Sequence, residues 1–211
     1  MKKESQVIFD KNVIEFVTVA AEFCAFLERA ESMKRSTFVD TTLKILPLLY
    51  LKASMLPKCE MIGDESPETY VTEEIYEVLR INLASILVEK DDYLEVFLPN
   101  MAYSDEPIKK NISEDLADIY QDIKDFIFVF QLGLNETMND SLAICQENFG
   151  LLWGQKLVNT MRALHDVKYS PKARGEDEEE EEYEPENNED CHCEDDDCHC
   201  HDHGCHCHDD E

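Results

Sequence analysis

The residues best suited to chemistry lie at positions 191–211, which divide into three seven-residue units: CHCEDDD, CHCHDHG and CHCHDDE. Each unit opens with Cys-His-Cys and carries Asp at its fifth place. Two thiolates separated by a single residue can reach the same ion, and the adjacent imidazoles add nitrogen ligands. The repeat therefore predicts a metal-binding tail. Its twelve nitrogen and sulfur donors are Cys191, His192, Cys193, Cys198, His199, Cys200, His201, His203, Cys205, His206, Cys207 and His208.

The number of donors limits how many ions the tail holds. Tetrahedral zinc takes four ligands, so twelve donors serve up to about three ions. Thiolate and imidazole together favour zinc or nickel, and the thiolates alone also suit copper(I). A zinc finger separates two ligand pairs by a dozen or so residues that fold around the ion, and this tail has no such interval. We therefore expect multivalent, exchangeable binding. The alternative is an acidic solubilising tail, in which exposed thiols would only be a liability.

The formal charge of −29 is unevenly distributed. Residues 175–211 hold 19 Asp and Glu and no Lys or Arg, which leaves 29 acids against 19 bases, or −10, for the rest of the chain. Such a surface repels phosphate backbones and anionic lipid headgroups. We expect no nucleic-acid or membrane partner, and favour cations and basic partners.

The first residues, MKKESQVIFDKNVIEF, contain too many charges for the apolar core of a signal peptide. The longest apolar runs fall far short of the ~20 residues that a membrane helix needs. These patterns predict a cytoplasmic protein.

Apolar residues recur at helical spacing over five stretches, roughly 5–32, 36–57, 72–87, 113–130 and 139–164. Ser36 or Thr37 is expected to cap the second helix and Thr72 the third. The steadiest apolar stripe is in the fourth helix. It comprises Leu116, Ile119, Tyr120, Ile123, Phe126, Ile127 and Phe130. The fifth helix is expected to bury Leu142, Cys145, Phe149, Leu152, Trp153, Leu157, Met161 and Leu164.

The periodicity predicts an all-α fold, an antiparallel helical bundle of about five helices with a disordered acidic C-terminal tail. No segment alternates as a strand would. The bundle domain is expected at residues 1–170. An acidic disordered linker at 171–190 follows, because it lacks the apolar surface needed to offset its ordering entropy. The metal-binding tail occupies 191–211.

Two blocks resemble a known family: LKILPLLYLKASMLP (43–57) and FGLLWGQKLVNTMRALHDV (149–167). Both are similar to the most recognisable stretches of a bacterial helical family, Domain of Unknown Function 5063. The resemblance spans about residues 5–169 and implies an all-helical fold and a bacterial source. It brings no activity, and the Cys/His tail lies outside it.

Catalytic motifs are not visible in the bundle. His165 is its only histidine, which excludes a di-iron site built from two Glu-x-x-His pairs, and no Gly-x-Ser-x-Gly is present. Together with Arg162 it is expected to suit the negative end of the last helix, or else to bind a partner. Cys24 and Cys145 are expected to be buried as small apolar residues.

Other residues of the two family-like blocks could line a shared groove or simply form core and rim. They are Tyr50, Lys52, Trp153, Gln155 and Lys156. Gly150 and Gly154, four residues apart, would permit a close helix crossing.

Three functions remain open. The favoured one is a non-enzymatic protein that binds transition metal through the tail, with the bundle as scaffold or docking module. The second is a helical protein–protein interaction adaptor whose tail is accessory, and the third is an enzyme with a groove near Trp153 and His165. The oligomeric state is left open.

Overall fold

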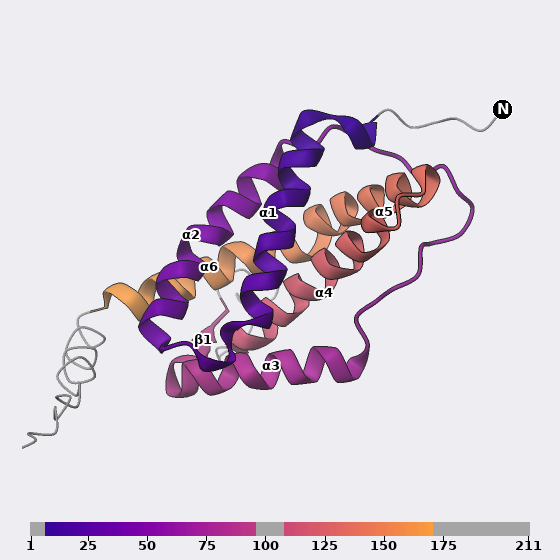
Figure 1. The fold of residues 1–211 in the computed structure, drawn as a ribbon. Coiled ribbons are helices and arrows are strands. Elements are labelled where there is room, and N and C mark those ends of the chain that lie inside the picture. The colour runs from indigo at the N-terminus through magenta and orange to yellow at the C-terminus, as the bar shows by residue number, and fades with distance from the viewer. Residues whose placement is uncertain (1–6, 96–107, 171–211) are drawn as a thin grey trace, which may run out of the picture.

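The computed structural model of the chain describes residues 7–95 and 108–170, which Figure 1 draws in colour. The predicted linker and all twelve tail donors lie outside these residues. The long helices are α1 (Lys11–Glu28), α2 (Arg35–Ser54), α3 (Glu73–Leu87), α4 (Ile112–Gln131), α5 (Asn135–Asn148) and α6 (Gly154–Tyr169). The short elements are η1 (Val7–Phe9), η2 (Ala30–Ser32), η3 (Val88–Lys90), β1 (Asp92–Leu94), β2 (Lys109–Asn111) and the π turn η5 (Phe149–Trp153).

The helices form the expected all-α bundle. α1 and α2 run antiparallel, and α3 lies across the end of the bundle where α1 finishes (Figure 1). An ion pair between Lys52 and Glu15, 2.6 Å apart, joins the end of α2 to the start of α1. α6 packs against α2 and runs antiparallel to it. An ion pair between Lys168, near the end of α6, and Asp40, near the start of α2, shows this direction.

α4 is the central helix and contacts α1, α3, α5 and α6. Its predicted apolar stripe is confirmed, since Leu116, Ile119, Ile123 and most of the other members are buried. A helix surrounded on several sides must bury a wide apolar face, which explains why this stripe is so regular in the sequence.

The expected helix starts are partly correct. Thr72 caps α3, and its hydroxyl accepts a hydrogen bond from the Ile75 N–H at 3.3 Å. The expected Ser36 or Thr37 cap of α2 is wrong, because the helix begins at Arg35 after Lys34, which makes no side-chain cap. α2 also continues through Pro47.

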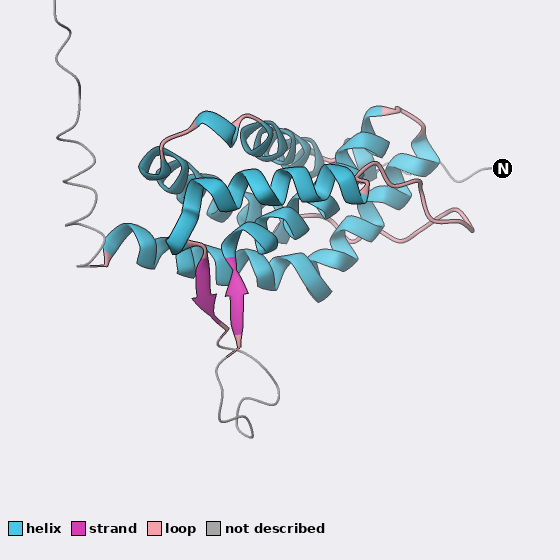
Figure 2. Cartoon of the chain, turned by 90° about the horizontal axis from the view of Figure 1, so that it is seen from below, coloured by secondary structure: helices cyan, strands magenta, loops and turns pink. Residues whose placement is uncertain are grey.

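The expectation that the chain has no strand is wrong at one place. β1 and β2 pair antiparallel, with Asp92 opposite Asn111, and project from the bundle in Figure 2. Three-residue strands are too short to show alternation in a sequence. Asp91, just before β1, accepts hydrogen bonds from the Ser113 N–H (2.7 Å) and hydroxyl (2.6 Å), so the hairpin caps the first turn of α4 from outside the helix.

The predicted fifth helix is divided by a π turn. From Asn135 to Tyr169 the chain passes without a loop through α5, the Phe149–Trp153 π turn and α6. A π turn winds more residues into each turn than an α-helix does, so it shifts the phase of the apolar face. Trp153 is fully buried, whereas Leu152 is 52% exposed, and the prediction that Leu152 faces the core is therefore wrong.

Gly154 is required by this turn rather than by a helix crossing. Its N–H donates to the Phe149 carbonyl, and a Cβ there would lie only 2.3 Å from that oxygen. A Cβ on Gly150 would meet nothing within 4 Å. The close helix crossing that this spacing would permit is therefore not formed at Gly150.

Candidate functional site

The long connection between α2 and α3, residues 55–72, crosses α4 and α5 and is held there by side chains bonded to its backbone. Gln146 of α5 accepts from the Cys59 N–H at 3.1 Å and donates to the carbonyls of Leu56 and Pro57. A loop without its own secondary structure must find partners for its backbone groups, and here a helix supplies them.

Two aspartates complete the attachment. Asp140 of α5 accepts from the N–H groups of Ile62 (2.7 Å) and Gly63 (2.8 Å). Asp125 of α4 accepts from the N–H groups of Tyr70 (2.7 Å) and Val71 (2.8 Å). Hydrogen bonds to an ionised acceptor are the stronger kind, so these contacts fix the connection in place.

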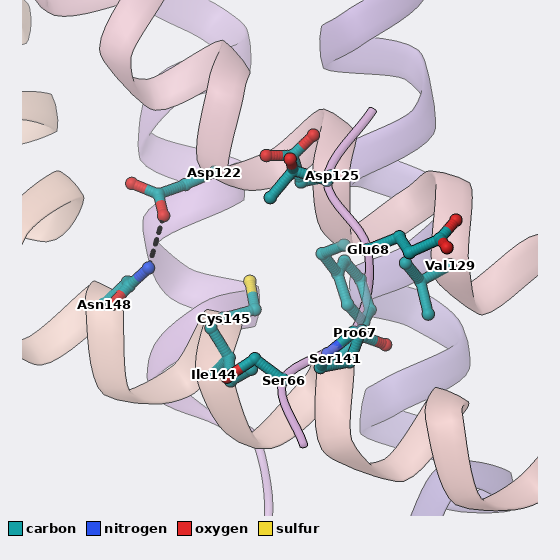
Figure 3. Close-up of a pocket in the computed structure, with 12 residues that line it drawn as sticks. Ser66, Pro67, Glu68, Asp122, Asp125, Val129, Ser141, Ile144, Cys145 and Asn148 are labelled. Atoms are coloured by element: carbon teal, nitrogen blue, oxygen red, sulfur yellow. Dashed lines mark hydrogen bonds between the residues drawn. The ribbon is translucent and has the colours of Figure 1, made fainter. Parts of the chain in front are cut away.

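A pocket of about 200 Å³ opens between this connection and the facing sides of α4 and α5 (Figure 3). Its lining residues are Ser66, Pro67, Glu68, Thr69, Asp122, Asp125, Phe126, Val129, Ser141, Ile144, Cys145 and Asn148. We call it the α4–α5 pocket. It combines acidic and apolar walls, and it contains no Lys, Arg or His among these lining residues.

The two aspartates of the pocket are only partly solvated. Asp122 accepts a 2.5 Å hydrogen bond from the Asn148 amide, as Figure 3 shows. Burial raises the pKa of Asp122, which this hydrogen bond and Lys156 offset only in part. Burial likewise raises the pKa of Asp125, against the effect of its two backbone donors.

The Cys145 thiol is not an activated nucleophile. It is 2% exposed, and burial raises its pKa well above the usual range, with the nearby Asp122 acting in the same direction. Nucleophilic cysteines need the opposite environment, one that lowers the pKa. The pocket therefore suits binding rather than thiol chemistry.

The first prediction concerns Asp122. The pKa of Asp122 is higher in the folded than in the unfolded protein. Below the unfolded pKa the carboxyl is neutral in both states, and its burial has little effect on stability. As pH rises from the unfolded to the folded pKa, the unfolded state ionises first, so the free energy of unfolding falls. Asp122→Asn keeps an oxygen acceptor for Asn148 and cannot ionise. We expect this variant to melt higher than the wild type at pH 7, with a smaller gain at pH 4.

Thermal unfolding at the two pH values tests this expectation. Glu147→Gln, at an exposed position of α5, is the control for loss of one charge. The raised pKa of Asp122 would be contradicted if the gain in melting temperature of Asp122→Asn over wild type were smaller at pH 7 than at pH 4.

Sequence reasoning missed these aspartates, although a signal was present. Asp115, Asp118, Asp122 and Asp125 follow steps of three, four and three along α4, so they form an acidic stripe beside the apolar one. Asp118 pairs with Lys156 of α6 and accepts from the Tyr76 hydroxyl of α3 at 2.9 Å. The stripe is the polar seam between α4 and its neighbours.

The predicted groove residues make separate polar contacts. Lys52 pairs with Glu15 of α1, Lys156 pairs with Asp118 of α4, and the Tyr50 ring lies 5.2 Å from that of Phe149. Gln155 donates to Asn159. Lys52, Lys156 and Tyr50 therefore each contact a different element, and Gln155 bonds within its own helix.

Trp153 and His165 do not share a groove either. Trp153 is fully buried, and its indole N–H donates to the Cys145 carbonyl at 3.1 Å. His165 lines a separate pocket with Arg162 and Asp166, and its ring lies 4.6 Å from that of Tyr169.

The expected burial of two bundle cysteines is confirmed. Cys24 and Cys145 are each 2% exposed, and burial raises the pKa of Cys24 to about 12. Cys59 is partly exposed, and its thiol donates to the Asn139 side-chain oxygen at 3.2 Å. Within residues 7–95 and 108–170, no group of three or more His, Cys, Asp or Glu could hold a metal ion. No helix in this part of the chain is long and apolar enough to cross a membrane.

Comparison with known proteins gives a family and a solved relative. The model of the family described as Domain of unknown function (DUF5063) matches residues 7–170. The crystal structure of protein BF1032 from Bacteroides fragilis is similar to this chain at 92% sequence identity and a TM-score of 0.73. The match covers 80% of this chain and 99% of that one. No curated protein matches.

Proposed function

We propose a function from the chain's own residues, because the chain belongs to the family described as Domain of unknown function (DUF5063) and that description states no activity. The protein binds transition metal without catalysing a reaction. The tail at 191–211 supplies the ligands, and the helical domain acts as scaffold or docking module. The observation that carries this proposal is the threefold Cys-His-Cys repeat.

Two features support a modular division. The family match ends at residue 170, before the linker and the tail begin. The cysteines of the helical domain are engaged elsewhere, since Cys24 and Cys145 lie in the core and Cys59 donates to Asn139. The proposed ligands are the twelve tail donors, and the ions are zinc or nickel, with copper(I) as a further candidate, up to about three.

Thiol labelling in the native protein tests the division. We expect a small alkylating reagent to modify the six tail cysteines rapidly. Cys24 and Cys145 should react only when the protein unfolds, because the thiolate is the reactive form and burial suppresses it. Zinc should protect the tail cysteines and leave the labelling of the helical domain unchanged.

Peptide mass spectrometry assigns each modified cysteine. Calcium, which prefers oxygen ligands, is the matched control ion and should give no protection. Equal labelling of the tail with and without zinc would refute the proposal.

A second candidate function rests on the exposed face of α2. Leu48, Leu51 and Met55 are 43%, 51% and 46% exposed and follow helical spacing along one stripe. Exposed apolar stripes of this kind mark interaction surfaces. This face supports an adaptor role, in which a protein partner binds residues 1–170 whether or not the tail carries metal.

The proposal places the protein in the bacterial cytoplasm. The relative from Bacteroides fragilis supports a bacterial source. The acidic charge disfavours nucleic-acid and membrane partners.

A further inference from the structure

We propose that the α4–α5 pocket binds an alkylammonium group, the charged end of a small aliphatic amine or of a lysine side chain. This site is separate from the tail and does not depend on metal binding. Its support comes from the charge of the pocket, its unused acceptors, its apolar wall and its size.

The charged side chains that line the pocket are all acidic. Glu68, Asp122 and Asp125 line it, and its described lining includes no cationic side chain. A second pocket of about 540 Å³ lies beside the same connection and is lined by Asp64, Glu65, Glu68, Glu136 and Asp140, again with no cationic side chain among its described lining residues. Two adjoining acidic surfaces concentrate cations near the opening.

Each pocket aspartate keeps one oxygen available. Asp122 receives the Asn148 amide on Oδ1, and Asp125 receives both of its backbone donors on Oδ1. Among the described residues, no hydrogen bond reaches the Oδ2 atom of either. An ammonium group carries three donors and no acceptor, so it can serve two carboxylates at once.

The wall of the pocket suits an aliphatic chain. Phe126, Val129 and Ile144 supply apolar surface beside the carboxylates. The Cys145 thiol is 2% exposed and points into the pocket in Figure 3, and no described residue gives it a hydrogen bond. A pocket of about 200 Å³ is smaller than the ~300–1,000 Å³ of drug-sized sites, so it fits a short amine.

Binding should depend on pH because the carboxylates must be ionised. Burial raises the pKa of both aspartates. A cation that enters the pocket stabilises their ionised form and so favours release of their protons. The other charged or titratable groups that face them are Asp118 on α4, Lys156 on α6, Cys145 on α5 and Glu68 on the connection. Affinity should therefore rise with pH through the range in which the two aspartates ionise.

Protein NMR with n-butylammonium chloride on the full chain tests the proposal. The readouts are the Tyr70 and Val71 backbone amides and the Asn148 side-chain amide, because they donate to the two aspartates. These signals report the pocket alone, even if amines also collect on the acidic tail. We expect saturable shifts with the amine, none with n-butanol or sodium chloride, and weaker binding at lower pH.

Matched variants assign the effect. Asp122→Asn with Asp125→Asn keeps both Oδ1 acceptors, and should weaken binding by at least about tenfold. Glu147→Gln, on the neighbouring helix α5, removes an exposed acid that is not among the lining residues and should leave affinity unchanged. If Nα-acetyl-lysine amide binds as well as butylammonium, the source is a lysine side chain. If it does not bind, the source is a free amine.

Three results would overturn the site. One is the lack of a saturable shift in the wild type. The others are equal shifts with n-butanol, which would indicate an apolar pocket only, and unchanged affinity at lower pH. None of these requires a variant to fold.

Discussion

Replacing all six tail cysteines by serine is expected to weaken zinc and copper(I) binding by at least about 100-fold, while weak nickel binding persists through the six histidines. Thiolates supply much of the affinity of such sites for soft and borderline ions, and serine hydroxyls do not replace them. Every carboxylate and imidazole stays in place, so the substitution separates the thiolate contribution from that of the acidic charge. Calorimetric titration of each metal measures the loss.

The matched control is Cys59→Ser in the helical domain. This thiol is partly exposed and donates to Asn139, so the variant changes the same chemical group outside the tail. We expect its zinc affinity to equal that of the wild type. A comparable loss in both proteins would show that Cys59 also contributes to zinc binding.

The proton balance gives an independent measurement. A free thiol with a pKa of about 8.5 is mostly protonated at pH 7, so each thiolate that binds zinc releases nearly one proton. Titrations in buffers of different ionisation enthalpy count the protons released per ion, and affinity should fall steeply as pH falls. Carboxylate ligands are already ionised at pH 7, so a count near zero would leave the tail as an unspecific polyanion.

Alanine at Gly150 in the π turn and at Gly154 directly after it is expected to have opposite effects on stability. In Gly154→Ala the new Cβ would lie 2.3 Å from the Phe149 carbonyl oxygen and 2.9 Å from the Phe149 ring. The turn must open or the backbone must shift, at a cost of about 2–3 kcal/mol. In Gly150→Ala the Cβ meets nothing within 4 Å, and the gain is about 0.4–1 kcal/mol because the unfolded chain loses freedom.

Thermal unfolding and fluorescence check this pair. For a chain of this size, ~1 kcal/mol shifts the melting temperature by roughly 2–4 °C, so Gly154→Ala should melt about 5–10 °C lower and Gly150→Ala slightly higher. Trp153 is the only tryptophan and is fully buried beside the substituted position. Its emission should shift to longer wavelength in Gly154→Ala alone. Equal melting temperatures for the two variants would show that the π turn is not what requires a glycine.

The features that the sequence predicted correctly are those encoded by neighbouring residues. The α4 stripe repeats with helical spacing, Thr72 lies beside the N–H that it caps, and Cys24 and Cys145 fall on apolar faces. The resemblance of residues 43–57 and 149–167 to the DUF5063 family is likewise confirmed. The tail repeat is also readable from the sequence, because its donors are adjacent along the chain, although the metal-binding function remains a prediction.

The features that the sequence did not predict depend on residues far apart in the chain. Asp91 caps α4 across the hairpin, and Asp125 of α4 accepts hydrogen bonds from the backbone of Tyr70 and Val71 in the α2–α3 connection. The phase change at the π turn exposes Leu152, which α-helical spacing assigns to the core.

By itself, then, the sequence determined the helical class, the acidic charge and the donor set of the tail, because composition and short-range spacing are properties of a linear chain. Only the tertiary structure decided that the α2–α3 connection crosses α4 and α5 to enclose an acidic pocket. That arrangement arises from hydrogen bonds between distant backbone and side-chain groups, and no local pattern specifies which of several aspartates will meet which loop.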